Sequence, residues 1–123
     1  MKRDLFEKRV FGLHIIGEVC TKNNKNLLFA KQTELFILKT IKRNGLHALG
    51  LLSHKFSNGG FSAIVNLAES HLAMHTWPEL NYLTIDIYTC NYTRDNNKSC
   101  RTIFESLVKF FNPSKIKKRV LKG

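Results

Sequence analysis

Acidic residues, cysteine pairs and long apolar runs are all scarce in this chain of 123 residues. The three cysteines are odd in number and form no CxxC pair, so they indicate neither a disulfide framework nor a zinc site and favour a reducing cytoplasm. No repeat, linker or low-complexity tract occurs. Hydrophobic residues at 43% and nine phenylalanines predict a single domain, residues 1–123, with a well-filled interior.

The most apolar stretch is too short to cross a membrane. Val10–Val19 is interrupted by Gly12, His14 and Gly17, and it falls well short of the roughly 20 residues that a spanning helix needs. It also lacks the small-residue cleavage site of a secretory signal. We therefore interpret it as a strand and expect a protein that is neither exported nor embedded in a membrane.

The shortage of acids leaves a strongly basic chain. Twenty Lys and Arg against nine Asp and Glu give a net charge of +11, which is typical of a partner of polyanions because cations on phosphates release counterions. The excess gathers at the ends of the chain, at Lys2, Arg3, Lys8, Arg9, Lys115, Lys117, Lys118, Arg119 and Lys122. Basic termini are most often solvated edges, so a nucleic-acid-binding module remains the less favoured alternative.

Hydrophobic periodicity predicts an α+β fold. In the first strand, Leu13 and Ile15 alternate with His14 and Ile16, and Leu28, Leu35, Leu38 and Ile41 recur at helical spacing. The predicted helices are Leu27–Arg43 and Cys100–Phe111, and the predicted strands are Val10–Val19, His47–Phe56, Phe61–Ala68, His71–Trp77, Tyr82–Cys90 and Ile116–Leu121. This order favours a two-layer α/β sandwich, a mainly antiparallel sheet with two helices on one face. A second copy of the chain is the simplest cover for the other face.

One stretch concentrates chemically useful side chains. Ser70 follows the acid Glu69, His75 comes five residues later, and Cys90 ends the next alternating run. A hydroxyl, an imidazole and a thiol supply a nucleophile, a base and an acid, which one small site could use together. Taken singly, each has an ordinary structural explanation: a turn serine, a strand histidine and a small buried cysteine.

The motifs around these residues resemble a known family. Ala68-Glu69-Ser70-His71, His75-Thr76-Trp77-Pro78-Glu79 and Asp86-Ile87-Tyr88-Thr89-Cys90 are similar to the signature of the prokaryotic S-adenosylmethionine decarboxylase proenzymes. The resemblance implies a chain that cuts itself between Glu69 and Ser70. The products would be a β chain of residues 1–69 and an α chain of residues 70–123, with Ser70 converted into a covalent pyruvoyl group.

That conversion gives the protein a reactive group that no standard side chain provides. An amino acid loses carbon dioxide slowly because the electrons left on Cα have nowhere to go, and an α-keto group joined to the substrate amine accepts them. A serine generates such a group when its hydroxyl attacks the preceding carbonyl and exchanges the amide for an ester. Removal of the serine Cα proton then expels the upstream chain.

The same resemblance implies roles for further residues. His75 would act in the elimination step, and Ser62 would hydrogen-bond the rearranging intermediate. In the mature enzyme, Cys90 would return a proton to the substrate Cα, a task that suits a thiol. Phe56 would stack on the adenine, and Glu79 would bind the ribose hydroxyls.

The resemblance also implies a homodimer with its active site at the interface, so that Phe56 and Ser62 can serve the pyruvoyl group of the other subunit. No metal is implied. The leading hypothesis is a decarboxylase of S-adenosylmethionine that makes the aminopropyl donor for spermidine synthesis. Because a chain of +11 repels a cationic sulfonium, carboxylates at Glu69 and Glu79 are a meaningful local bias. A pyruvoyl decarboxylase of arginine or ornithine remains open, as does the non-catalytic basic module.

Overall fold

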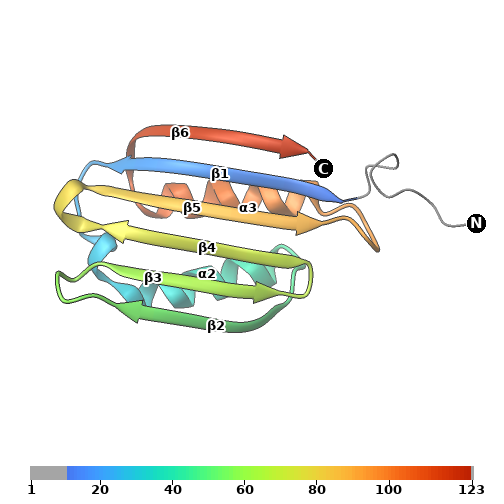
Figure 1. Ribbon diagram of the computed structural model, residues 1–123, viewed down its shortest axis with the longest axis horizontal. Helices are drawn as coiled ribbons and strands as arrows, with labels where there is room; N and C mark the ends of the chain where they lie inside the picture. The colour runs from blue at the N-terminus through green and yellow to red at the C-terminus, as the bar shows by residue number, and fades with distance from the viewer. Residues whose placement is uncertain (1–10, 123) are drawn as a thin grey trace, which may run out of the picture.

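A single antiparallel sheet forms one layer of the protein, and two helices form the other (Figure 1). The computed structural model describes residues 11–122. The strand order is β2-β3-β4-β5-β1-β6, and each neighbouring pair is antiparallel. The elements are β1 Gly12–Thr21, η1 Asn26–Leu28, α2 Ala30–Arg43, β2 Ala48–Lys55, β3 Phe61–Leu67, β4 Ser70–Trp77, η2 Pro78–Leu80, β5 Tyr82–Cys90, α3 Asn97–Phe110 and β6 Pro113–Lys122. The predicted two-layer α+β sandwich is confirmed.

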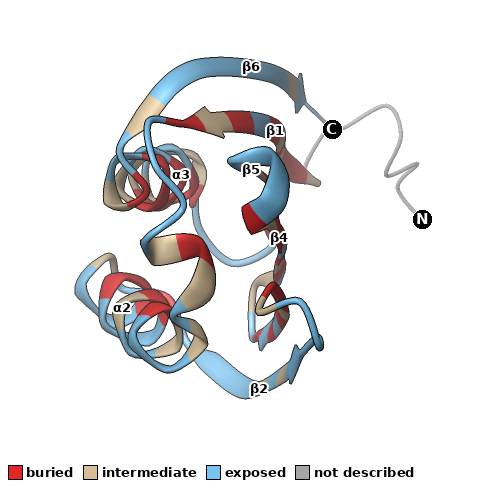
Figure 2. Cartoon of the chain, turned by 90° about the vertical axis from the view of Figure 1, so that its left-hand side faces the viewer, coloured by how far each residue is buried: buried red, intermediate tan, exposed pale blue. Residues whose placement is uncertain are grey.

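The core lies between the sheet and the helices α2 and α3 (Figure 2). Alternation along each strand decides which side chains enter it. In β4, Leu72 and Met74 are fully buried, whereas His71 before them and His75 after them are exposed. We call the helix-covered side of the sheet the inner face and the opposite side the outer face. The predicted sidedness of β1 also holds, with Leu13 and Ile15 buried.

Several predicted boundaries shift for local reasons. The first helix is divided, because Phe29 adopts a non-helical conformation (φ −103°, ψ 77°) between η1 and α2. The second helix begins at Asn97, three residues earlier than expected, where the Asp95 carboxylate accepts a hydrogen bond from the backbone N–H of Asn97. The last strand is longer than Ile116–Leu121 and lies at the sheet edge beside β1. Val10, the predicted start of the first strand, lies outside the described residues.

The apolar spacing predicted the helix α2 but only part of its buried face. Ile41 is buried as its spacing suggests, whereas Leu35 is 61% exposed and the buried positions include Thr33 and Thr40. A threonine tolerates this burial when its hydroxyl is satisfied within the helix, as Thr33 is by donating to the carbonyl of Phe29 at 2.8 Å. Hydrophobicity alone therefore identified only some of the buried positions.

No described helix covers the outer face (Figure 2). Across its middle runs an apolar row in which Leu52, Ile64 and Ala73 are neighbours in register. Leu52 is 75% exposed and Ile64 is 47% exposed. Within residues 11–122, no helix combines the length and the apolar character that crossing a bilayer requires.

Candidate functional site

Ser70 opens strand β4 directly after a tight turn and holds a strained backbone. Its φ of +149° is unusual for any residue other than glycine, and such strain persists only where the surrounding structure enforces it. The enforcing contacts are visible on both sides. Ser70 pairs with Leu67 on β3 and with Thr89 on β5.

The peptide bond before Ser70 is bound to the last residue of β5. The backbone N–H of Cys90 donates to the carbonyl oxygen of Glu69 at 2.7 Å. This hydrogen bond polarises the carbonyl that a serine hydroxyl would attack, and it places Cys90 beside the same bond. The structure therefore brings Ser70, Glu69 and Cys90 together at one end of the sheet.

The Glu69 side chain binds His47, the residue that precedes β2. Its Oε2 lies 2.8 Å from Nδ1 of His47, and its Oε1 accepts from the His47 backbone N–H at 3.1 Å. Partial burial raises the pKa of this carboxyl, but the hydrogen bonds from His47 outweigh burial and leave the pKa below its ordinary value. This contact anchors the turn that strains Ser70.

Three further polar residues lie next to Ser70 on the outer face. Ser70 Oγ is 3.2 Å from Nδ1 of His71, and His71 Nε2 is 3.8 Å from Oδ1 of Asp86. That same Asp86 oxygen is 2.6 Å from Nε2 of His14. Sequence reasoning gave His14 and His71 no function and used Asp86 only as part of a motif.

The distances among these three residues are those of one hydrogen bond and one longer contact rather than of a metal cage. Their ligand atoms lie within 4.8 Å of one another. Neighbouring ligand atoms of a tetrahedral zinc site, with bonds of about 2 Å, lie roughly 3.3 Å apart. The His14–Asp86 separation of 2.6 Å is instead that of a short, charge-assisted hydrogen bond.

Ser62 and His75 occupy the other end of the outer face. They are direct partners in the β3–β4 register, so their side chains point to the same side. His75 also lines a hollow of about 390 Å³ together with Phe56, Trp77 and Glu79. The Glu79 carboxylate is held at the rim by Asn58, whose Nδ2 donates to Oε2 at 2.7 Å. The structure thus gathers the residues predicted to bind substrate with His75.

The two groups of predicted residues are far apart within one copy of the chain. Ser70 and His75 are five residues apart on the straight strand β4, a separation of about 17 Å at the usual rise per residue. A single copy therefore does not unite the hydroxyl, the imidazole and the thiol in one small site. It holds them in two separate groups, one at each end of β4.

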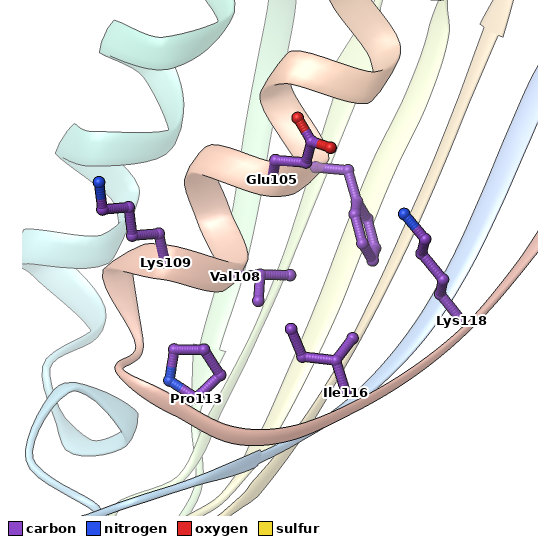
Figure 3. A pocket seen from close by; sticks show the side chains of 7 residues that line it. Glu105, Val108, Lys109, Pro113, Ile116 and Lys118 are labelled. Carbon is purple, nitrogen blue, oxygen red and sulfur yellow. The ribbon is translucent and has the colours of Figure 1, made fainter.

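A second hollow, of about 450 Å³, lies on the inner face between α3 and β6 (Figure 3). Its walls are mainly apolar, formed by Phe104, Val108, Pro113 and Ile116, and Lys118 lies over the Phe104 ring at 5.9 Å. None of the predicted functional residues contributes to it. The candidate site is therefore on the outer face.

Together, fold and geometry define a small α+β protein that carries a strained serine beside a polarised peptide bond. The family model for S-adenosylmethionine decarboxylase matches residues 13–122. The S-adenosylmethionine decarboxylase proenzyme of Prochlorococcus marinus (strain MIT 9211) is 37% identical over 102 residues, covering 80% of each chain. An arginine decarboxylase proenzyme of Caldivirga maquilingensis is 31% identical over 118 residues, covering 94% of this chain and 85% of the relative.

A solved structure agrees with these sequence matches. The adenosylmethionine decarboxylase of Aquifex aeolicus superposes with a TM-score of 0.79 at 26% identity, covering 92% of this chain and 90% of the other. The chain belongs to the S-adenosylmethionine decarboxylase family, as the sequence motifs predicted.

Proposed function

We propose that the protein is a self-cleaving, pyruvoyl-dependent decarboxylase of S-adenosylmethionine. The observation that carries this proposal is the strained Ser70, whose upstream carbonyl accepts a hydrogen bond from Cys90 at 2.7 Å. Strain at the residue to be cut lowers the barrier to leaving the amide ground state. The hydrogen bond stabilises the charge that develops on the carbonyl oxygen.

The residues in place fit the processing chemistry. Ser70 Oγ attacks the Glu69 carbonyl carbon, the C–N bond breaks, and an ester joins Glu69 to the serine side chain. His75 then takes the Cα proton of Ser70, and the ester bond breaks. The backbone carboxylate of Glu69 leaves as the C-terminus of a chain of residues 1–69. Hydrolysis of the resulting enamine, with loss of ammonia, gives the pyruvoyl group. When present, this group supplies the electron sink for decarboxylation.

Ser70 and His75 lie about 17 Å apart within one copy of the chain. The complete site therefore requires two copies. The apolar row of Leu52, Ile64 and the half-buried Ala73 lies between the two ends and gives a second copy an apolar surface to pack on. Consider a two-fold axis that lies parallel to the sheet, perpendicular to β4 and level with Ala73. It stacks two outer faces and brings the Ser62–His75 end of one copy over the Ser70–Cys90 end of the other. We therefore include a homodimer in the proposal.

The hollow around His75 supports a substrate with an aromatic group and hydroxyls. Phe56 is 45% exposed and presents its ring for stacking, and the Glu79 carboxylate at the rim can accept hydrogen bonds from a ribose. S-adenosylmethionine carries both groups, and a sulfonium cation gains from a nearby carboxylate. The arginine decarboxylase among the relatives makes arginine the substrate to compare with it.

Two measurements test the proposal. Intact-mass spectrometry of purified protein should show fragments of residues 1–69 and 70–123 for the wild type and a single uncut chain for Ser70→Ala. Release of labelled carbon dioxide from carboxyl-labelled S-adenosylmethionine, arginine and ornithine should then identify the substrate, with S-adenosylmethionine the fastest. A wild-type chain that never cuts itself would instead favour the basic binding module.

A further inference from the structure

We propose that His71 is the base that activates Ser70 in the first step of self-cleavage, and that Asp86 positions His71 for it. This inference rests on the proposed function and adds catalytic residues to it. Ser70 Oγ lies 3.2 Å from Nδ1 of His71, within reach of a direct proton transfer. Hydroxyl, imidazole and carboxylate follow in the same order as in a Ser-His-Asp triad, with a longer imidazole–carboxylate distance of 3.8 Å.

Asp86 favours one position for the proton of His71. Its Oδ1 lies 3.8 Å from Nε2 of His71, beyond hydrogen-bond distance, and its negative charge favours the proton of a neutral His71 on Nε2 and the lone pair on Nδ1, toward Ser70. Asp86 is itself held from the other side by His14 Nε2 at 2.6 Å. A carboxylate fixed in this way also stabilises the imidazolium that forms when His71 accepts a proton.

The conversion of the Glu69–Ser70 amide into an ester needs no proton from outside these residues. His71 Nδ1 takes the Ser70 hydroxyl proton as Oγ bonds to the Glu69 carbonyl carbon, and the carbonyl oxygen becomes an oxyanion facing the Cys90 N–H. When the C–N bond breaks, the Ser70 nitrogen receives that proton from His71. The products are an ester and a free amine, and His71 returns to its neutral form. No further reactant is consumed.

Position separates this role from that of His75. His71 is the residue next to Ser70, whereas His75 is five residues further along β4, at the other end of the sheet. The first proton transfer therefore belongs to a base in the same copy of the chain. The later removal of the Cα proton belongs to His75 from a second copy.

Hydroxylamine distinguishes the two steps because it cleaves the ester and leaves an ordinary amide intact. His75→Ala should form the ester and stall, so hydroxylamine should split it between residues 69 and 70. His71→Ala should cut itself about 100-fold or more slowly than the wild type, which is the usual size of a general-base effect. It should also accumulate no ester. In the double variant, hydroxylamine cleavage should be about 100-fold slower than in His75→Ala alone.

Asp86→Asn is the milder test, and about tenfold slower cutting is expected because the base remains while its orientation is lost. Asn66→Ala is the matched control. Asn66 is exposed and lies directly opposite His71 on β3, so its loss should leave the cutting rate unchanged. Equal melting temperatures for the variants would exclude unfolding as the cause.

The outcomes separate this inference from the function on which it rests. If the wild-type chain stays uncut, as Ser70→Ala is expected to, the proposed function is wrong. A wild type that cuts itself while His71→Ala does so within threefold of the same rate would remove only the role of His71. Ester accumulation in His71→Ala would move its role to a later step and equally overturn the inference.

Discussion

The two ends of strand β4 are built for different tasks. At the Ser70–Cys90 end the distinctive features are in the backbone. Ser70 has a strained φ of +149°, and the Cys90 N–H donates to the carbonyl of Glu69 at 2.7 Å. At the Ser62–His75 end the strands are regular, and side chains in register border an aromatic hollow. In the proposed function, the first end carries the bond that is cut and the second carries the residues that assist the cut and bind the substrate.

The spacing between the ends is rigid. Leu72 and Met74 lie between them on β4, and both are fully buried in the core. Small movements of one copy therefore cannot bring His75 to Ser70, because β4 would have to leave the sheet. The comparison teaches that the two groups stay apart within one copy, and for this reason the proposed function includes a second copy.

The largest expected effect comes from mixing two inactive variants. In a mixed dimer of His75→Ala and Ser70→Ala, one site combines the intact Ser70 of the first copy with the intact His75 of the second. Cutting of the His75→Ala chain should therefore appear only after mixing, whereas each variant alone stays uncut. Mass spectrometry of chains with different tags measures which copy is cut.

The control for this experiment mixes Ser70→Ala with the double variant Ser70→Ala/His75→Ala, which supplies no intact Ser70 and should stay uncut. Should the His75→Ala chain remain whole after subunits have demonstrably exchanged, the two ends would have to meet within one copy. The face-to-face arrangement would then be wrong.

The second prediction concerns the thiol at the bond-breaking end. Cys90→Ala keeps the backbone N–H that binds the Glu69 carbonyl, so self-cleavage should continue at close to the wild-type rate. Turnover should fall about 100-fold if, as the family resemblance implies, the Cys90 thiol returns the proton to the substrate Cα. The two rates are measured separately, by fragment mass and by carbon dioxide release. Normal turnover would remove the proton-donor role.

The sequence predicts well those features of the site that depend on neighbouring residues in the chain. Glu69-Ser70 breaks the strand pattern between two alternating runs, and the structure indeed has a turn there with β4 starting at Ser70. Alternation also placed His14 on the side opposite Leu13 and Ile15. These features depend on neighbours in the chain, and period-two patterning reports them directly.

The non-local part could not be predicted from a single sequence. His14 meets Asp86 only because β1 is inserted next to β5, which joins residues 72 positions apart. The Ser62–His75 pairing depends on the register of β3 with β4, and a shift of one residue would place one of these side chains on the inner face. Burial of Thr33 in place of Leu35 likewise depends on the carbonyl of Phe29, not on hydrophobicity.

The third prediction tests the surface between the two ends. Ile64→Lys places a charge in the middle of the apolar row, and the lost burial of one such side chain is worth about 1.5–3 kcal/mol. The dissociation constant of the Ile64→Lys dimer should be at least about tenfold higher than that of the wild type. Self-cleavage should slow as the dimer dissociates. Leu35→Lys is the control, because Leu35 is 61% exposed on α2 and far from the outer face. Sizing at a series of concentrations checks both, and an unchanged dissociation constant for Ile64→Lys would argue against this interface.

The smallest predicted effect reports on the Ser62–His75 end alone. Tyr82 pairs with Trp77 at this end, and its hydroxyl donates to Glu18 Oε1 at 2.6 Å. That hydrogen bond, with a lesser contribution from burial, raises the pKa of the Tyr82 phenol from 10.0 to about 12. Because the folded-state pKa is the higher one, the stabilisation is complete below pH 10 and is lost as the pH rises through about 12.

Near-ultraviolet titration of the phenolate, taken as the difference between wild type and Tyr82→Phe, should show this late transition. Glu18→Gln should return the transition toward 10, because the hydrogen bond to the carboxylate is the main cause of the raised pKa. A Glu18→Gln variant that titrates like the wild type would show that Glu18 does not hold the phenol.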